Sequence, residues 1–162
     1  MKIRLSSLAF TNELGEERIK TYYASQNFEL TWANALTFCR SFEMELVELD
    51  TGAEADYFNK LCSEHINLFT STVHIGGSDH GNDKNKWYWM SSGKEIKYNM
   101  KYAPTEPNNV DGRQNCLALY IHPESFEFAD YDCDESKSIF ACQRITSICN
   151  HKWIDPDCTP KL

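Results

Sequence analysis

The chain has 162 residues, of which 41% are hydrophobic and 13% aromatic, enough for one sizeable core. Sixteen basic residues against 24 acidic residues give a net charge of −8, which disfavours nucleic acid and anionic membrane surfaces as partners. Seven cysteines in a short chain favour a disulfide framework and an oxidising, extracellular compartment. No apolar run approaches the ~20 residues of a membrane span.

The N-terminal segment does not have the pattern of a signal peptide. Its apolar stretch, residues 5–10, is short and is interrupted by two serines. We therefore expect a secreted protein whose sequence is given in mature form with an added start Met. We also expect residues 1–17 to be an N-terminal extension, with residues 13–17 as a solvated lead-in to the folded body.

The first half of the chain predicts one strand and then two helices. Residues 19–25 are rich in the β-branched and aromatic residues of a strand. Thr31 can cap a first helix whose apolar residues fall at the spacing of one buried face: Trp32, Ala35, Leu36 and Cys39. Thr51 and Glu54 form a capping box for a second helix, which we expect to run to about Ile66.

From Val73 onward the helical period disappears, and short apolar runs alternate with turn residues. We expect strands at residues 73–77, 87–90, 117–121 and 139–144, forming a small antiparallel sheet. At least two of Trp87, Tyr88 and Trp89 should lie in the core. Long polar connections, residues 78–86 and 91–115, separate the strands, and such loops in a compact domain are usually functional.

The second connection contains the stretch Thr105-Glu106-Pro107-Asn108-Asn109. Carboxylate and carboxamide oxygens are ligands that calcium prefers, and an X-Pro bond adopts the cis form within about 1 kcal/mol of trans. A turn at Pro107 would aim both flanking side chains the same way, leaving one acceptor and one donor free for a sugar diol. The alternative is a polar surface turn, because Pro and Asn favour turns.

The order and spacing of several motifs resemble those of a C-type lectin-like domain over about residues 18–145. The features that carry the resemblance are Tyr22-Tyr23, Trp32, Cys39, Ile75-Gly76-Gly77, Trp87, Trp89, Glu106-Pro107-Asn108, Cys116, Cys133 and Phe140-Ala141-Cys142. The sequence is similar to small secreted invertebrate lectins of this family. The resemblance implies an α+β fold in which two helices pack on small antiparallel sheets, with a long ligand-binding loop region. It also implies the disulfides Cys39–Cys142 and Cys116–Cys133.

Three cysteines remain, and two of them lie in a C-terminal tail, residues 146–162. We predict a Cys149–Cys158 bridge that leaves Cys62 free or available for an intermolecular disulfide, while a Cys62 bridge to either tail cysteine stays open. Zinc binding is a weaker alternative because the sequence contains no Cys-x-x-Cys; its candidate ligands would be Cys133, Cys142, Cys149, His151 and Cys158.

The resemblance also implies a calcium and carbohydrate site. Glu106, Asn108 and Asp130 match the family's ligand positions, whereas Gln114 stands where a Glu is usual and Ala129 where an Asn is usual. Gln114 still offers a carbonyl oxygen, but Ala129 offers no side-chain oxygen. We therefore predict a calcium and carbohydrate site at Glu106, Asn108, Gln114 and Asp130, with its calcium affinity reduced to millimolar or lost.

An auxiliary calcium position in the family uses acidic residues four apart, and Asp79 and Asp83 have this spacing. Asn109 and Asn115 are its other candidate ligands. The alternative interpretation is that both carboxylates are solvated loop residues of an acidic protein.

Two functions remain open. The first is a secreted, calcium-dependent lectin for glycans or glycoproteins of the mannose, fucose or glucose type, in innate immunity or host interaction. The second is a protein-binding module on the same fold, acting without calcium or sugar. We do not expect an enzyme, because the sequence contains no hydrolase, zinc-protease or phosphate-binding motif.

Overall fold

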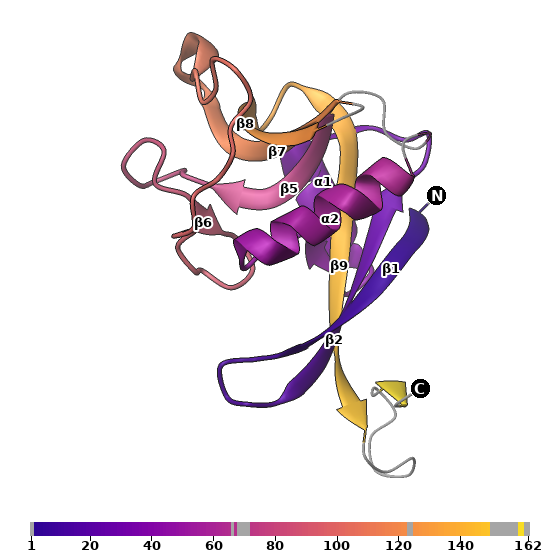
Figure 1. Ribbon diagram of the computed structural model, residues 1–162. Helices are drawn as coiled ribbons and strands as arrows, with labels where there is room; N and C mark the ends of the chain where they lie inside the picture. The colour runs from indigo at the N-terminus through magenta and orange to yellow at the C-terminus, as the bar shows by residue number, and fades with distance from the viewer. Residues whose placement is uncertain (1, 66, 68–71, 123–124, 150–158, 161–162) are drawn as a thin grey trace.

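A computed structural model describes residues 2–65, 67, 72–122, 125–149 and 159–160. The α+β class that the sequence predicts is confirmed: the described residues form two α-helices, a short 3-10 helix at Val110–Gly112 and a large sheet (Figure 1). The long strands neighbour one another in the order β1 (Lys2–Thr11), β2 (Glu17–Ser25), β9 (Lys137–Cys149), β5 (Thr72–Ser78), β7 (Gln114–His122) and β8 (Ser125–Asp132).

Strand β9 is the centre of this arrangement and runs along much of the molecule (Figure 1). It also pairs with three short strands, β3 (Leu30–Thr31), β4 (Glu45–Leu46) and β10 (Thr159–Pro160), while β6 (Tyr88–Trp89) pairs with β5. Most neighbouring strands pair antiparallel, as the sequence predicts, but two pairs do not. Strands β5 and β9 pair in parallel through Val73 with Ile139 and His74 with Phe140, and β10 also runs parallel to β9.

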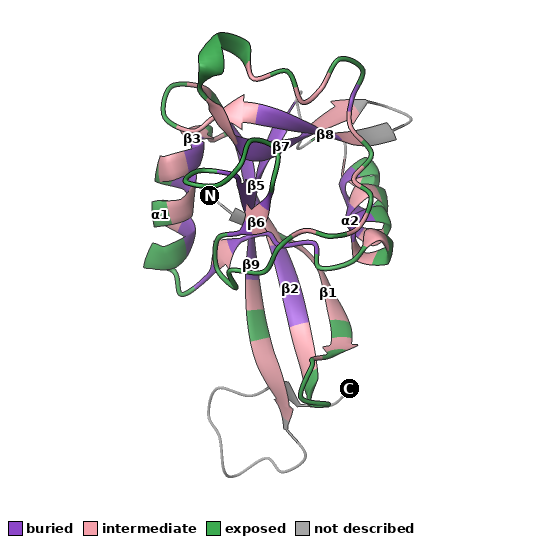
Figure 2. Cartoon of the chain, turned by 90° about the vertical axis from the view of Figure 1, so that its left-hand side faces the viewer, coloured by how far each residue is buried: buried purple, intermediate pink, exposed green. Residues whose placement is uncertain are grey.

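The two helices lie on opposite sides of the sheet (Figure 2). Helix α1 (Trp32–Ser41) begins at the predicted cap, where the Thr31 side chain accepts a hydrogen bond from the Asn34 amide at 3.3 Å. Three of the four residues of the predicted stripe are buried, Trp32, Ala35 and Cys39, and Leu36 is half-buried. Both the existence of this helix and its buried face are therefore confirmed.

Helix α2 (Gly52–Glu64) is capped by Thr51, whose side chain accepts from the Glu54 amide at 3.1 Å. Glu54 does not complete the capping box at Thr51. Its carboxylate accepts from the amide of Asp50 at 2.8 Å and from the buried Lys20 ammonium at 2.7 Å, and Tyr22 donates to it at 2.6 Å. The cap of α2 is thus tied to β2.

Each helix covers its own hydrophobic cluster. The α2 side holds Phe58, Leu61, Val73, Ile75, Leu117 and Leu119, and the α1 side holds Trp32, Ala35, Leu46 and Phe140. Trp87 and Trp89 are 2% and 1% exposed, which confirms that at least two of the three aromatic residues at 87–89 are core residues. The sheet therefore has an apolar layer on both faces.

The sheet continues beyond both predicted boundaries, residues 18 and 145. At the N-terminal end β1 pairs with β2 from Lys2 with Ser25 to Thr11 with Glu17. At the C-terminal end β9 continues to Cys149. Strand β1 is the edge strand beside β2, and the continuation of β9 pairs with β2 from its other side through Thr146 and Ser147.

The structure contains the disulfides Cys39–Cys142 and Cys116–Cys133, the two pairs that the resemblance implies. Cys62 is a free thiol inside the core, and burial raises its pKa. An intermolecular disulfide through Cys62 is therefore disfavoured, because no partner chain can reach the thiol. Cys133 and Cys142, two of the candidate ligands of the zinc alternative, are engaged in these disulfides, which counts against that alternative. The predicted Cys149–Cys158 bridge involves Cys158, which lies outside the described residues, as does His151.

Candidate functional site

The connection before β7 is docked on strand β8. Its early part is held by backbone hydrogen bonds from Phe128 to Lys101 at 2.8 Å and from Ala103 to Phe128 at 2.9 Å. The Glu106–Pro107 peptide bond beyond these contacts is cis, the form that the sequence allows at this position. Docking on β8 brings the Glu106-Pro107-Asn108 turn next to Asp130.

Asp130 anchors this turn. Its two carboxylate oxygens accept hydrogen bonds from the backbone amides of Asn108 and Asn109, at 2.9 and 2.8 Å. Its side chain is inaccessible to solvent. The loop is therefore fixed by a buried carboxylate that the edge strand β8 supplies.

Glu106 has one occupied and one unoccupied oxygen. Asn108 Nδ2 donates to Glu106 Oε1 at 2.7 Å, whereas Oε2 is buried and has no hydrogen-bond partner among the described residues. Burial raises the pKa of Glu106 to about 7, and the neighbouring Asp130 carboxylate adds to the shift. A cation bound at Oε2 would supply the positively charged partner that this carboxylate oxygen lacks among the described residues.

Gln114 closes the loop on itself. Its Oε1 accepts from the Val110 amide at 2.8 Å, and its own amide donates to Asn109 Oδ1 at 3.2 Å. Asn108 Oδ1 is 3.2 Å from the same Val110 amide. The four predicted site residues, Glu106, Asn108, Gln114 and Asp130, thus belong to one hydrogen-bonded loop region.

The same loop carries unusual backbone conformations. Thr105, Asn109 and Asp111 have φ values of 71°, 47° and 55°. Positive φ is tolerated by Asn and Asp but is an outlier for a β-branched residue such as Thr105, and outliers of this kind are typical of functional loops.

Position 129 supplies no ligand. Ala129 is inaccessible to solvent and is paired with Ala118 of β7 in the sheet. The donor set of the loop therefore consists of two carboxylates, Glu106 and Asp130, and two carboxamides, Asn108 and Gln114.

The residues of the predicted auxiliary site differ in burial and in the hydrogen bonds that they already make. Asp79, at the end of β5, is 2% exposed, whereas Asp83 is exposed in the following connection. Asn109 Oδ1 accepts a hydrogen bond from the backbone amide of Gln114, and the backbone carbonyl of Asn115 accepts one from Ser78 Oγ at 2.7 Å. Within the described parts of the chain, no three His, Cys, Asp or Glu side chains are arranged to hold a metal ion.

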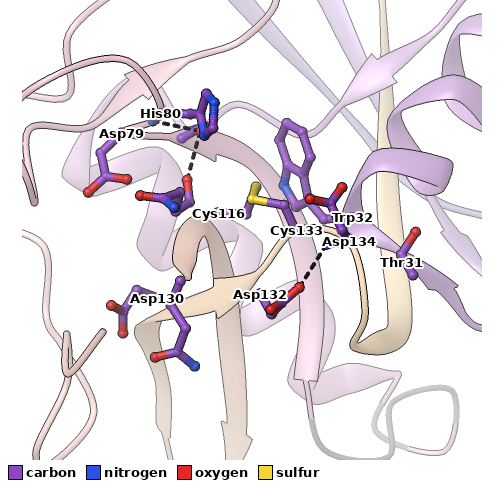
Figure 3. Close-up of a disulfide and its surroundings, with 12 residues drawn as sticks. Thr31, Trp32, Asp79, His80, Cys116, Asp130, Asp132, Cys133 and Asp134 are labelled. Atoms are coloured by element: carbon purple, nitrogen blue, oxygen red, sulfur yellow. Dashed lines mark hydrogen bonds between the residues drawn. A yellow bond between two sulfur atoms is a disulfide. The ribbon is translucent and has the colours of Figure 1, made fainter. Parts of the chain in front are cut away.

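Sequence reasoning missed Lys84, whose ammonium lies beside Asp79. Lys84 Nζ is 3.1 Å from Asp79 Oδ2 and 3.7 Å from Asp130 Oδ2. The Asp79 and Asp130 carboxylates lie on the same side of the Cys116–Cys133 disulfide (Figure 3). One lysine thus pairs with an acidic residue that follows β5 and with another in β8, and no local sequence pattern predicts this contact.

With the loop, the disulfides and the helices in place, comparison with known proteins decides the family. Residues 28–144 match the family model described as the lectin C-type domain. The chain belongs to the C-type lectin domain family. Members of this family are generally not enzymes.

Relatives and a solved structure agree with this assignment. The chain is 31% identical over 116 residues to C-type lectin 37Da of Drosophila melanogaster, covering 67% of this chain and 57% of that protein. It is 28% identical over 136 residues to E-selectin of Rattus norvegicus, covering 82% of this chain but only 23% of E-selectin. The C-type lectin domain of murine dendritic cell inhibitory receptor 2, solved in complex with an N-glycan, superposes with a TM-score of 0.61 at 21% identity, covering 77% of this chain and 90% of that one.

None of the helices in the described part of this C-type lectin is long and apolar enough to cross a membrane.

Proposed function

We propose that this C-type lectin domain is a secreted glycan-binding protein that recognises sugars at the 105–114 loop with the help of calcium. The observation that carries the proposal is the pair of Glu106 and Asn108, which lie side by side, with Glu106 Oε2 buried and without a hydrogen-bond partner in the described part of the chain. The sugar preference implied by the Glu-Pro-Asn motif is for mannose, fucose or glucose. A role in innate immunity or host interaction would suit such a specificity.

The chemistry of the donor set fits calcium. Calcium takes six to eight oxygen ligands in flexible geometry, and extracellular modules bind it with Kd values of about 10⁻⁴–10⁻³ M. Glu106, Asn108, Gln114 and Asp130 would hold the ion, and the bound ion would offer open positions for two sugar hydroxyls. With two carboxylates and with Ala129 contributing no oxygen, the affinity should lie at the weak end of that range.

The chain's own residues also prepare the site for a diol. Asn108 Nδ2 is a donor and the Glu106 carboxylate an acceptor, and together they can bond adjacent hydroxyls of one sugar. Asp130 holds the amides of the turn, so the loop does not need to be ordered when the sugar binds. Preorganisation of this kind reduces the entropic cost of binding.

Calcium titration calorimetry, followed by retention on a mannose column and elution with chelator, tests the proposal. Glu106→Gln should abolish retention, because it removes the carboxylate that both calcium and sugar need. Glu95→Gln removes the same charge from an exposed position outside the loop and should be retained like the wild type. Absence of wild-type retention in millimolar calcium would refute the proposal.

A second candidate is protein binding without calcium or sugar. It is favoured by Ala129, which contributes no ligand, and by the hydrogen bonds from the Val110 amide that already engage the Asn108 and Gln114 side-chain oxygens. Partner capture from native fluid in the presence of chelator distinguishes the two functions. A partner whose capture needs calcium would count against this second candidate.

A further inference from the structure

The ammonium of Lys84 is the counterion of two buried carboxylates at the base of the long loop. The Asp79 and Asp130 side chains are 1% and 0% exposed, whereas the Lys84 side chain is 33% exposed. Among the ion pairs of the described residues, Lys84 supplies the cation within 4 Å of each of these two carboxylates. Their negative charge is therefore offset in part by an ammonium of the protein itself.

The acceptors around Lys84 Nζ come from separate parts of the chain. Asp79 follows the end of β5, Asp130 lies in β8, and the third acceptor is the backbone carbonyl of Gln114 at the start of β7. The ammonium is also 5.4 Å from the centre of the buried Trp87 ring. Lys84 thus fastens the 78–86 connection to two neighbouring strands.

The carboxylates that Lys84 contacts also hold the 105–114 loop and the 78–86 connection. The Asp130 carboxylate that pairs with Lys84 also accepts the amides of Asn108 and Asn109. The Asp79 carboxylate likewise accepts the Asn85 amide at 2.8 Å, while its other oxygen is buried without a hydrogen-bond partner among the described residues. One lysine therefore braces both loops through two carboxylates.

Two carboxylates and a backbone carbonyl are also oxygens that calcium would take. An ammonium already within contact distance of these oxygens competes for them and repels a divalent ion. We propose that Lys84 is the built-in cation of the auxiliary position: it holds the 78–86 and 105–114 segments together without metal and excludes calcium there. This replaces the auxiliary calcium site predicted from Asp79 and Asp83, and it does not depend on glycan binding.

Thermal unfolding in chelator tests the bracing role. Lys84→Met leaves two carboxylates buried without a counterion, and its Tm should fall by roughly 6–12 °C. Lys86→Met removes the same charge from an exposed position of the same connection, and its Tm should fall by less than about 2 °C. Equal Tm values for the two variants would overturn the proposal.

Hydrogen exchange in chelator locates the effect. Residues 105–114 should lose amide protection in Lys84→Met and keep it in Lys86→Met, because the first variant weakens the Asp130 anchor. If Lys84→Met fails to fold, Lys84→Arg, which keeps a cation, provides the comparison and should retain the protection of this segment. If residues 105–114 lose their amide protection in Lys84→Arg as well, the proposal is contradicted.

Calcium alone tests the exclusion. In a Glu106→Gln background, where the sugar-site calcium has lost its carboxylate, millimolar calcium should leave the Tm unchanged. A rise of several degrees would mean that the auxiliary position takes calcium despite Lys84, and would overturn the proposal. Because no sugar is present, this result is independent of whether the domain binds glycans.

Discussion

Acidification should destabilise this domain through His74, a fully buried residue of β5. Its ring packs edge-on against Tyr131, with 5.4 Å between the centroids, and its Nε2 lies 3.3 Å from the Ser136 carbonyl. Burial disfavours the charged imidazolium and lowers the pKa of His74 from 6.5 to about 4. His74 is therefore neutral in the folded state at neutral pH.

The sign and size of the effect follow from this shift. Between pH 6.5 and about 4 the unfolded chain binds a proton at His74 that the folded chain does not, so stability present above pH 6.5 is lost as the pH falls. The shift corresponds to about 3 kcal/mol of unfolding free energy. That is a large part of the 5–15 kcal/mol typical of a domain.

Denaturant unfolding of the wild type and of His74→Gln in chelator, at about pH 7.5 and about pH 4.5, measures the contribution. The glutamine variant should be less stable than the wild type at neutral pH but should lose about 3 kcal/mol less on acidification. His80→Gln, an exposed control in the connection that follows β5, should show the wild-type pH dependence. If His74→Gln and the wild type lose equal stability, the buried neutral histidine is not the acid-sensitive group.

Three further predictions concern the loop and the core. Glu106→Gln should raise the Tm at neutral pH in chelator. Because the pKa of Glu106 is raised in the folded state, ionisation of Glu106 costs stability as the pH increases from 4.5 through about 7, and the variant avoids this cost. An unchanged or lower Tm would contradict this. Gln114→Glu should tighten calcium binding by on the order of tenfold through the added charge, measured by calorimetry, and an unchanged Kd would place Gln114 outside the ligand set. Gly77→Ala should cost about 1–3 kcal/mol in urea unfolding, because its Cβ would stand 2.3 Å from Leu117 Cδ1; a neutral effect would show that Leu117 moves aside freely.

The helices could be predicted from the sequence because their signals are local. Thr31 and Thr51 each cap a helix, and apolar residues at helical spacing mark the faces that the sheet covers. The second half of the capping box failed for a tertiary reason. Glu54 faces Lys20 and Tyr22 from β2, which compete for its carboxylate with the cap.

Two of the long strands were missed, for different reasons. In β8 the alternation of Phe126 and Phe128 with polar neighbours is a strand signal of period two that could have been used. In β1 the signal is disturbed by an irregularity in the register between Arg4 and Ser6, which shifts the alternation along the strand. The parallel pairing of β5 with β9 is a long-range choice that no local pattern contains.

The resemblance groups Glu106, Asn108, Gln114 and Asp130 as one site, and their role as ligands stays a prediction. In the structure Asp130 of β8 accepts hydrogen bonds from the loop that carries the other three residues. That Asp130 binds loop amides and also pairs with Lys84 depends on the docking of three separate segments. A contact between segments so far apart in the sequence could not be predicted from local patterns.

The division of labour between the two carboxylates bears on which function this lectin domain performs. Asp130 would be needed even in a domain that never meets calcium, because it anchors the amides of Asn108 and Asn109 and neutralises Lys84. Glu106 has no comparable structural duty: one of its oxygens is buried without a partner among the described residues, and its ionised form is costly at neutral pH. A residue that costs stability and is supported by a strained, anchored turn is better explained by a ligand than by the fold. If Glu106→Gln loses glycan retention and also has a higher Tm in chelator, Glu106 is a residue that binds ligand at a cost in stability.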